Sequence, residues 1–278
     1  MQIVALEEKI IQLHSYIAQF SSALVAFSGG IDSAFLCKIT RDVLGRKNVL
    51  AITAVSASLP QKEKEQTITT AIQLDVPHQF IFTDELENEH YVANPVNRCY
   101  FCKSELYTKL TQSTFAKQYE VIFNGTNADD LGDFRPGIVA GAEYKILSPL
   151  AHCGFAKNDI RNEAQKLNIA IWNKPASPCL SSRIPYGESV TQKKLLQIEQ
   201  AEDFLHSLGF AVCRVRHHDT IARIEIPPED FIAITEKKIR MQINTRLKEI
   251  GFLFVTIDVS GFTSGSLNSV LLELPQHN

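Results

Sequence analysis

The string Ser28-Gly29-Gly30-Ile31-Asp32-Ser33 is the first stretch whose residue types and spacing point to chemistry. It follows the apolar run 23–27, which predicts a short buried strand, and precedes apolar residues at helical spacing. A strand that turns through two glycines into a helix presents backbone N–H groups and the positive end of a helix dipole, which suit a phosphate. The alternative is an ordinary strand–helix turn with a Ser/Asp cap. No lysine follows, so the loop is not of the Walker type.

A pair of cysteines, Cys99 and Cys102, is the second feature. A Cys-x-x-Cys spacing suits a redox dithiol, half of a zinc site or two ligands of an iron–sulfur cluster. Cys179, in a loop rich in proline and serine, is the natural third member. Three thiolates would leave one position open on a cubane cluster, whereas zinc would need a fourth ligand, for which His152 or Cys153 is available.

Two further stretches could bind a nucleotide or a phosphate. The segment 124–130 follows a short predicted strand and contains Gly125 and Asp129, which suits a second wall of a nucleotide site, although a polar turn fits equally. Arg135, in the same loop, could meet a phosphate. Arg214 and Arg216 alternate onto one strand face, where they could grip a phosphate or simply form an exposed cationic face.

Composition limits the class of protein. The chain has 278 residues, 45% of them apolar, and a net charge of −3, as expected for a soluble protein large enough for two domains. We find no basic run that predicts nucleic-acid binding and no apolar stretch near the ~18–20 residues that span a bilayer. The N-terminal residues lack a signal-peptide core, so we expect a cytoplasmic protein. Its six cysteines should then be thiols or metal ligands, with Cys37 and Cys213 in the core.

The elements that must position these residues predict an α/β fold. Apolar runs at 23–27, 49–55, 78–82 and 121–123 alternate with helical patterns at 4–20, 31–44 and 60–74, which indicates a parallel sheet covered on both faces. We expect a helix from about Glu105 to Lys117 and another, capped by Asp159, to Leu167. Ligands on such sheets lie beyond the carboxyl ends of the strands.

The remainder predicts a second, small α+β domain. We place the boundary after Pro185, giving domains 1–185 and 186–278. A helix at 191–208 is followed by strands at 211–216 and 221–226, which could pair as a hairpin through His217, His218 and Asp219. Arg223 and Glu225 would pair across the strands. A mostly helical stretch at 229–249 and a third strand at 252–259 complete the domain.

These motifs together carry a family resemblance. Ser28–Ser33 resembles the PP-loop of the ATP pyrophosphatase superfamily, which splits ATP into AMP and pyrophosphate. With the strings 125–130, 135–137, 179–187 and Arg214-Val215-Arg216, the chain resembles the LarE family of ATP-dependent sulfur transferases. The resemblance runs from about residue 20 to Gly265.

The resemblance implies a reaction. A carboxylate of a pyridinium biscarboxylic acid mononucleotide attacks ATP to give an acyl adenylate and pyrophosphate. Sulfur then displaces AMP to leave a thiocarboxylate, and a second round converts the other carboxylate in nickel-pincer nucleotide biosynthesis. Implied partners are this small-molecule nucleotide, sulfide or a sulfur donor and other pincer-biosynthesis proteins, with no nucleic acid and no membrane. The family's members form trimers or hexamers, so a homo-oligomer is expected.

The resemblance also assigns cofactors and site residues. ATP and Mg²⁺ would be bound by Ser28, Gly29, Gly30, Asp32, Ser33, Gly125 and Asp129. Catalysis would use Asp32 with Cys99, Cys102 and Cys179, the three cysteines matching the branch proposed to hold a [4Fe-4S] cluster. Substrate-binding positions would be Lys103, Ser182, Arg183, Glu202, Arg214, Arg216 and Asp230.

Three alternatives to this function stay open. A related branch has a single cysteine, at the position matching Cys179, and sacrifices that cysteine's sulfur. Other PP-loop enzymes thiolate tRNA or form amides, although amidation has no use for three cysteines. A module without turnover could hold zinc through Cys99, Cys102, Cys179 and His152.

Overall fold

A computed structural model describes residues 5–132, 136–175 and 177–263. The chain divides into two compact units. The first comprises Met1–Tyr91 and Val96–Ser177, and the second comprises Val92–Pro95 and Pro178–Asn278. Arg135 and Asp133 lie outside the described residues. No helix in the described part of the chain is long and apolar enough to cross a membrane.

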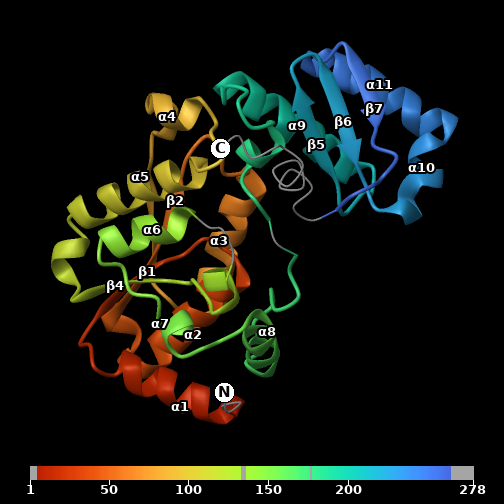
Figure 1. The fold of residues 1–278 in the computed structure, drawn as a ribbon. Coiled ribbons are helices and arrows are strands. Elements are labelled where there is room, and N and C mark those ends of the chain that lie inside the picture. Colours follow the sequence, from red (N-terminus) through yellow and green to blue (C-terminus); the bar gives the residue numbers. More distant parts are fainter. Residues whose placement is uncertain (1–4, 133–135, 176, 264–278) are drawn as a thin grey trace. The chain divides into compact units, whose positions relative to one another are not determined.

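The first unit contains a four-stranded parallel sheet (Figure 1). Its strands are β1 (Ala23–Ala26), β2 (Val49–Val55), β3 (His78–Phe82) and β4 (Val121–Asn124), in the order β3-β2-β1-β4. Every neighbouring pair is parallel, which confirms the α/β class. Because the strands are parallel, the loops after β1 and β4 meet at one edge of the sheet.

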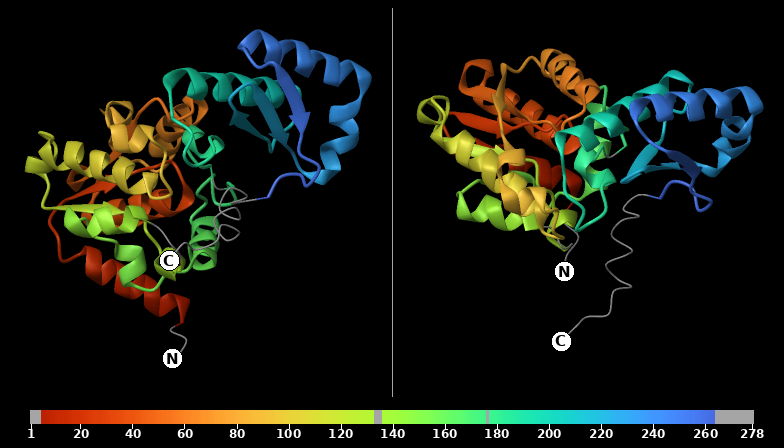
Figure 2. Two further views of the ribbon diagram at one scale, coloured as in Figure 1. Left: turned by 45° about the horizontal axis from the view of Figure 1, so that its top comes forward. Right: turned by 90° about the horizontal axis from the view of Figure 1, so that it is seen from above.

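Helices cover both faces of this sheet (Figures 1 and 2). Side chains such as Val25 and Ala51 face a core that includes residues from α1 (Leu6–Ile17), α2 (Ile31–Leu44), α3 (Gln61–Gln73), α7 (Pro149–His152) and α8 (Lys157–Lys166). Their neighbours Leu24 and Leu50 face the other way, toward Leu110 of α5 (Arg98–Gln112). Helix α6 (Pro136–Glu143) packs on α5. This alternation is the period of two that a doubly covered sheet requires.

Shorter elements join the main ones. In the first unit these are η1 (Arg46–Asn48), η2 (Glu85–Glu87), η3 (Ala116–Gln118) and η4 (Asp129–Gly132). In α4 (Glu89–Val92), the residues up to Tyr91 belong to the first unit and Val92 to the second. The second unit contains η5 (Leu180–Arg183) and η6 (Pro228–Asp230).

The second unit is a three-stranded sheet with helices on one face. Strand β5 (Arg214–His218) pairs antiparallel with β6 (Ile221–Glu225), which pairs parallel with β7 (Phe254–Ile257). Its core joins one face of the sheet to α9 (Gln192–Ser207), α10 (Phe231–Thr235) and α11 (Lys237–Ile250). Side chains alternate along the hairpin, so the other face carries arginines and a glutamate.

The structure corrects several of the predicted boundaries. The helix expected from about Glu105 to Lys117 begins at Arg98 and ends at Gln112, so Cys99 and Cys102 lie on its first turns. Asp159 was expected to cap the next helix. It is instead the third residue of α8, and its carboxylate accepts the N–H of Ala156 at 3.0 Å.

His217 and His218 were expected in the hairpin turn but lie in β5. The turn is made by the next two residues, and Asp219 adopts a φ of 52° there. Asp is among the residues that tolerate this left-handed conformation, which lets the strand continue through both histidines. His217 therefore faces the core, where its ring bonds to Gln197 at 3.1 Å and packs on Phe252.

The buried His217 makes the stability of the second unit depend on pH. Burial, with a smaller contribution from the charge of Lys194, lowers the pKa of His217 to about 4. In the unfolded chain the His217 imidazole has a pKa near 6.5, so below that pH the unfolded state binds more protons than the folded state. The free energy of unfolding therefore falls as the pH drops from about 6.5 toward about 4. We expect a loss approaching about 1.4 kcal/mol per pH unit between about pH 6 and 4. Hydrogen exchange of β5 and β6, compared with a His217→Gln variant, measures it. An equal pH dependence in the variant would contradict this assignment.

Candidate active site

The turn after β1 forms a cradle at the start of α2. Gly29 has a φ of 75°, and a Cβ there would lie 2.8 Å from the Thr67 side chain, so this position needs glycine. The Ser33 hydroxyl donates to the Gly30 carbonyl at 3.0 Å and accepts the Ser28 N–H at 3.2 Å. These bonds fix the turn, while the first turn of α2 leaves backbone N–H groups without intrahelical partners.

The end of β4 packs directly against this cradle. A Cβ on Gly125 would lie 2.8 Å from the Ser33 nitrogen and 3.0 Å from its Cα. Only glycine allows such a close approach of two backbones. The structure therefore brings Gly125 together with Ser28–Ser33, at the carboxyl edge of the sheet, as the sequence predicts.

Asp32 lies in the first turn of α2 and carries an unusual charge environment. Its Oδ2 accepts a hydrogen bond from Nζ of Lys157, the first residue of α8. Burial raises the pKa of the Asp32 carboxyl; the Lys157 ammonium opposes this shift, and Asp130 adds to it. The Oδ1 atom is buried, and no hydrogen-bond partner for it occurs among the residues that the structure describes.

The loop after β4 is fixed by its own polar groups. The N–H of Asn127 donates to the Asp130 carboxylate at 3.1 Å, and the N–H of Asp130 donates back to the side-chain amide oxygen (Oδ1) of Asn127 at 3.1 Å. Asp129 accepts the Lys157 N–H at 2.7 Å. Three carboxylates, those of Asp32, Asp129 and Asp130, thus border the cradle with Lys157 between them.

These residues fit a magnesium ion. A carboxylate oxygen is the ligand type that Mg²⁺ prefers, and the buried Oδ1 of Asp32 has no donor in the described structure. Mg²⁺ binds through one or two carboxylates plus substrate phosphates. Asp32 would be such a carboxylate, at the helix start where phosphates bind.

A second lysine lies at the other side of the turn. Lys174 donates from Nζ to the Gly29 carbonyl at 3.4 Å and to Glu63 at 2.6 Å. Neither Lys157 nor Lys174 was predicted as a site residue. They follow the loop by more than 120 residues, so no local pattern could have found them.

Cys99 and Cys102 lie three residues apart on α5 and hence on one face of that helix. Cys99 is exposed and Cys102 is partly exposed. The Cys102 thiol donates to the buried Glu85 carboxylate at 3.6 Å. Lys103 follows on the same helix, and its side chain packs where α6 begins, since a Cβ on Gly137 would lie 2.9 Å from it.

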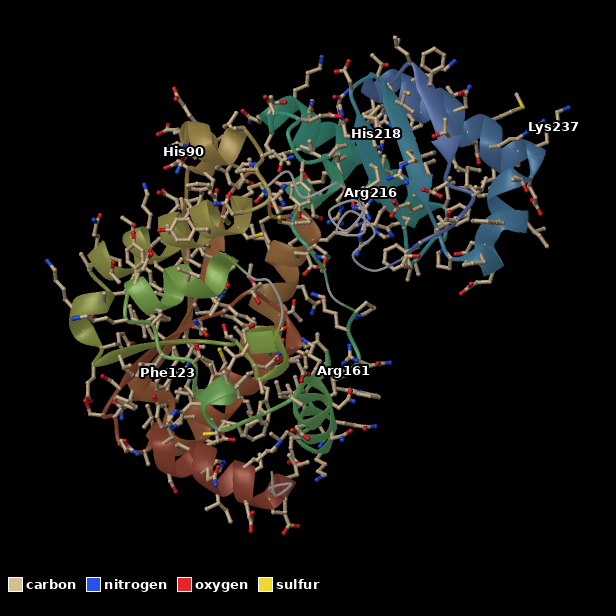
Figure 3. All side chains as sticks on the ribbon, viewed as in Figure 1. His90, Phe123, Arg161, Arg216, His218 and Lys237 are labelled. Atoms are coloured by element: carbon tan, nitrogen blue, oxygen red, sulfur yellow. The ribbon has the colours of Figure 1, made fainter. Side chains whose placement is uncertain are left out.

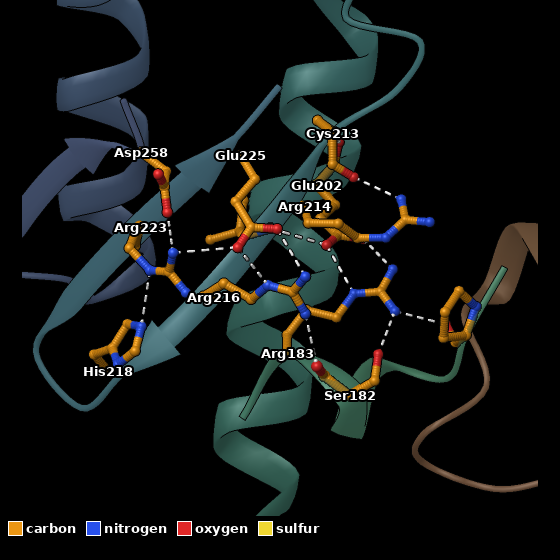
Figure 4. A network of polar contacts seen from close by, with 12 residues as sticks. Ser182, Arg183, Glu202, Cys213, Arg214, Arg216, His218, Arg223, Glu225 and Asp258 are labelled. Atoms are coloured by element: carbon orange, nitrogen blue, oxygen red, sulfur yellow. Dashed lines mark hydrogen bonds and ion pairs between the residues drawn. The ribbon is translucent and has the colours of Figure 1, made fainter. Parts of the chain in front are cut away.

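Cys179 stands at the start of η5 in the second unit and is partly exposed. The adjacent Arg183 is buried, with 2% of its side chain exposed, and its Nη1 donates to the carbonyls of Pro178 and Cys179 at 2.6 and 3.0 Å and to the Ser182 hydroxyl at 2.9 Å. Arg183 also forms a bidentate pair with Glu202 at 2.9 Å (Figure 4). Glu202 in turn accepts the N–H of Val215 in β5 at 3.0 Å. The loop that carries Cys179 is thus tied to the sheet through one buried guanidinium.

A second buried pair lies beside the first. Arg216, which Figure 3 labels among the side chains, binds Glu225 across the hairpin with contacts of 2.9 and 2.7 Å. It also donates to the Ser182 carbonyl at 2.8 Å (Figure 4). Arg223 contacts Glu225 at 3.3 Å and also pairs with Asp258. The predicted cross-strand pairing of Glu225 is confirmed, with Arg216 as its partner. On this face of β5, Arg216 is buried within a network of polar contacts.

Arg214 has a different environment from Arg216. Its Nη1 donates to the Cys213 carbonyl at 2.6 Å, and its guanidinium lies 5.3 Å from the centre of the Phe262 ring. Burial, followed by the charge of Arg183, lowers its pKa. A bound anion beside Arg214 would stabilise the charged form of its guanidinium. Asp230, also predicted as a site residue, is partly exposed at the end of η6.

The described residues contain no group of three or more His, Cys, Asp and Glu side chains placed to hold a metal ion. Cys99 and Cys102 belong to the first unit and Cys179 to the second. Cys37, Cys153 and Cys213 are buried, which confirms the core positions predicted for Cys37 and Cys213. The His152 ring packs against Tyr16 in a tilted arrangement, with ring centres 4.4 Å apart.

A parallel sheet with this glycine cradle and acidic edge defines an α/β nucleotide-binding protein of the PP-loop class. The NAD synthase family profile matches residues 4–91, which include the cradle. The chain is 38% identical, over 89% of both chains, to the pyridinium-3,5-bisthiocarboxylic acid mononucleotide synthase of Lactiplantibacillus plantarum. The chain therefore belongs to the LarE family of ATP-dependent sulfur transferases.

Two further relatives extend the comparison. The uncharacterized protein slr1717 of Synechocystis is 43% identical over 96% of this chain and 99% of its own. The uncharacterized protein MJ0830 of Methanocaldococcus jannaschii is 31% identical over 87% of this chain and 90% of its own. Both alignments cover most of each chain.

The close approach at Gly125 predicts a sensitive position. Gly125→Ala should weaken ATP binding and destabilise the first unit by about 1–3 kcal/mol, because the new methyl group would displace the backbone of Ser33. Gly132→Ala is the matched control, since a Cβ there meets nothing within 4 Å. Calorimetric titration with ATP and urea unfolding compare the two. Equal ATP affinity and equal stability of the two variants would show that the close approach of Gly125 to Ser33 does not constrain the site.

Breaking the buried ion pair of Arg216 and Glu225 should cost more stability than breaking an exposed ion pair of the same unit. Arg216→Met should destabilise the second unit by about 3–5 kcal/mol, because it leaves the Glu225 carboxylate, which is 1% exposed, without its main partner. Arg246→Met, in the exposed pair with Glu249, should cost at most about 1 kcal/mol. Hydrogen exchange of β6 measures both. Similarly small losses of stability in both variants would show that the buried Glu225 carboxylate does not need the Arg216 guanidinium.

Proposed function

We propose that this protein converts both carboxylates of pyridinium-3,5-biscarboxylic acid mononucleotide to thiocarboxylates for nickel-pincer nucleotide biosynthesis. The observation that carries the proposal is the 38% identity, over 89% of both chains, to a synthase named for the bisthiocarboxylic acid product. The cradle and its acidic edge supply the physical basis for the ATP-dependent half of this reaction.

The first half-reaction is adenylation. A substrate carboxylate oxygen attacks the α-phosphorus of ATP, the bond to the β-phosphate bridging oxygen breaks, and pyrophosphate leaves with the electron pair. We propose that the cradle N–H groups bind the departing pyrophosphate, because preformed donors stabilise charge as it develops. Asp32 and Asp129 would hold Mg²⁺, which neutralises phosphate charge when bound.

The second half-reaction is sulfur transfer. A sulfur nucleophile attacks the acyl carbon, the bond from that carbon to the AMP oxygen breaks, and AMP leaves. We propose that Cys99, Cys102 and Cys179 hold a [4Fe-4S] cluster, since all three are reduced cysteines with some exposure. When bound by three cysteines, such a cluster has one iron open to an external sulfur. The Arg183 contacts to the Cys179 carbonyl would keep that ligand's loop in place.

We propose that the substrate phosphate binds to the second unit. We propose that Arg214 binds it, because the burial of this guanidinium and the nearby Arg183 charge favour an added anion. Ser182, Arg216, Glu202 and Asp230 would complete the substrate site, and Lys103 would contribute from the first unit. We further propose that residues 1–185 perform the ATP chemistry, that residues 186–278 bind substrate, and that copies assemble into a trimer or hexamer.

The function is tested by pyrophosphate release. With ATP and Mg²⁺, we expect release to depend on the pyridinium mononucleotide and to fall sharply with the nucleoside that lacks the phosphate. Arg214→Met should remove most of this preference for the phosphorylated substrate. ATP binding without pyrophosphate release would instead identify a binding module. Release stimulated by tRNA or by ammonia would identify a different PP-loop activity.

The cluster is tested independently of activity by anaerobic reconstitution. We expect an absorption band near ~400 nm and bound iron in the native protein, with both lost in Cys102→Ser. Cys153→Ser is the matched control, because Cys153 is buried away from solvent and belongs only to the zinc alternative. Colourless native protein, or bound zinc that depends on Cys153 or His152, would refute the cluster.

A further inference from the structure

The carbonyl group of Phe27, the residue just before the cradle, is held by a side chain of the neighbouring strand. The Phe27 N–H donates to the Ile52 carbonyl at 2.8 Å, as in a parallel ladder. Its carbonyl oxygen accepts the hydroxyl of Thr53 in β2 at 2.7 Å. Thr53 is 2% exposed and has a second partner at 2.9 Å, the Nε2 atom of His78 in β3. Side chains from two strands therefore meet at the peptide group that leads into the cradle.

The direction of these hydrogen bonds follows from the number of protons available. A threonine hydroxyl has one proton, and Thr53 donates it to the Phe27 carbonyl. The Thr53 oxygen must then accept from His78, so Nε2 of His78 carries a proton. Burial lowers the pKa of His78, which favours the neutral ring with a single proton. We therefore expect that single proton on Nε2 rather than on Nδ1.

The same direction continues through the cradle. The Phe27 carbonyl and the Ser28 N–H belong to one planar peptide group, so fixing one fixes the other. The Ser28 N–H donates to the Ser33 hydroxyl at 3.2 Å, and this hydroxyl donates its own proton to the Gly30 carbonyl at 3.0 Å. The Gly30 carbonyl also accepts the Ala34 N–H at 3.0 Å. Two donors thus fix the last peptide group of the cradle.

We propose that His78 and Thr53 are positioning residues for the phosphate cradle, acting through one continuous hydrogen-bond chain. Its members all donate in the same direction: His78 Nε2, the Thr53 hydroxyl, the peptide group 27–28 and the Ser33 hydroxyl, which ends on the Gly30 carbonyl. In such a chain each bond polarises the next one, which strengthens the whole. This inference rests on the proposed ATP chemistry and adds residues outside the cradle that prepare it.

The hydrogen-bond chain ends on the peptide group that starts α2. The Gly30 carbonyl shares a plane with the N–H of Ile31, the first residue of α2, so the chain also fixes the direction of that N–H. Donors that are aimed before the phosphate arrives cost no reorganisation during the reaction. Loss of the Thr53 hydroxyl would leave the carbonyl of the buried Phe27 without this donor and free the peptide group 27–28 to rotate.

Nucleotide affinity tests the hydrogen-bond chain. The probe is a magnesium-bound ATP analogue with a methylene bridge between the α- and β-phosphates. In Thr53→Val, which keeps the shape without the hydroxyl, calorimetry should show binding about 3- to 10-fold weaker. Thr53→Ser keeps the hydroxyl and should stay within about twofold of the native affinity. His78→Phe removes the first donor and should weaken binding by a smaller factor, about two- to threefold.

Thr70→Val is the matched control for Thr53→Val. Thr70 is 1% exposed on α3, and its hydroxyl accepts from Gln66, outside the hydrogen-bond chain. This variant should leave the analogue affinity unchanged. Equal affinities of Thr53→Val and Thr70→Val would overturn the proposal, and an unchanged affinity in His78→Phe would overturn the role of His78.

The proton on His78 tests the direction of the chain without any ligand. In the full-length protein with isotope-labelled histidine, NMR correlation spectra at neutral pH should show His78 as a neutral ring protonated on Nε2. The loss of its signals in His78→Gln assigns them. A proton on Nδ1 with Nε2 bare would mean that Thr53 donates to the ring, and would overturn the proposal. Neither measurement uses the pyridinium substrate, so failure of the proposed substrate assignment would leave both tests intact.

Discussion

Compensation of negative charge at the carboxyl edge of the parallel sheet is the constraint on which the site depends. Asp32 enters the first turn of α2, and the loop after β4 places Asp129 and Asp130 nearby. Burial raises the pKa of Asp32 even with Lys157 in contact. Lys157 supplies one cation beside Asp32, and Mg²⁺ would supply another in the complex that we propose.

The backbone makes this concentration of charge possible. Gly125 and Gly29 allow two loops and a helix start to approach more closely than any side chain would permit. In the second unit, buried groups of opposite charge lie close together. Buried guanidinium groups of Arg183 and Arg216 are each fixed by a bidentate carboxylate, and Arg183 also fixes the carbonyl of Cys179. In both units, precise positions for reactive groups depend on buried charge that is paired within the same unit.

The strands and the cradle could be predicted from sequence because their signals are local. The ranges 49–55 and 78–82 agree with β2 and β3 residue for residue, and the string Ser28–Ser33 identifies the cradle. Helix boundaries near Arg98 and the turn after His218 could not be predicted as well. Pro95 lies three residues before Arg98, but it does not mark the exact residue at which the helix begins. No glycine or proline lies near His218, and the burial of His217 in the core decides where that strand ends.

Long-range pairs were beyond the sequence for a different reason. Lys157 and Asp32 are 125 residues apart, and nothing near either residue indicates the other. The alternation of Arg214 and Arg216 correctly predicted a shared face, but not that η5 would cover Arg216 and leave it 6% exposed. Which residues are buried depends on tertiary packing, and tertiary packing therefore decides that Arg216 is paired with the Glu225 carboxylate.

In the function that we propose, one chain activates substrate repeatedly with ATP and carries sulfur without consuming itself. Mass spectrometry of the intact chain after anaerobic turnover with sulfide distinguishes this function from the sacrificial route. We expect several thiocarboxylates per chain and an unchanged protein mass. One thiocarboxylate per chain, together with loss of the sulfur atom from Cys179, would contradict it.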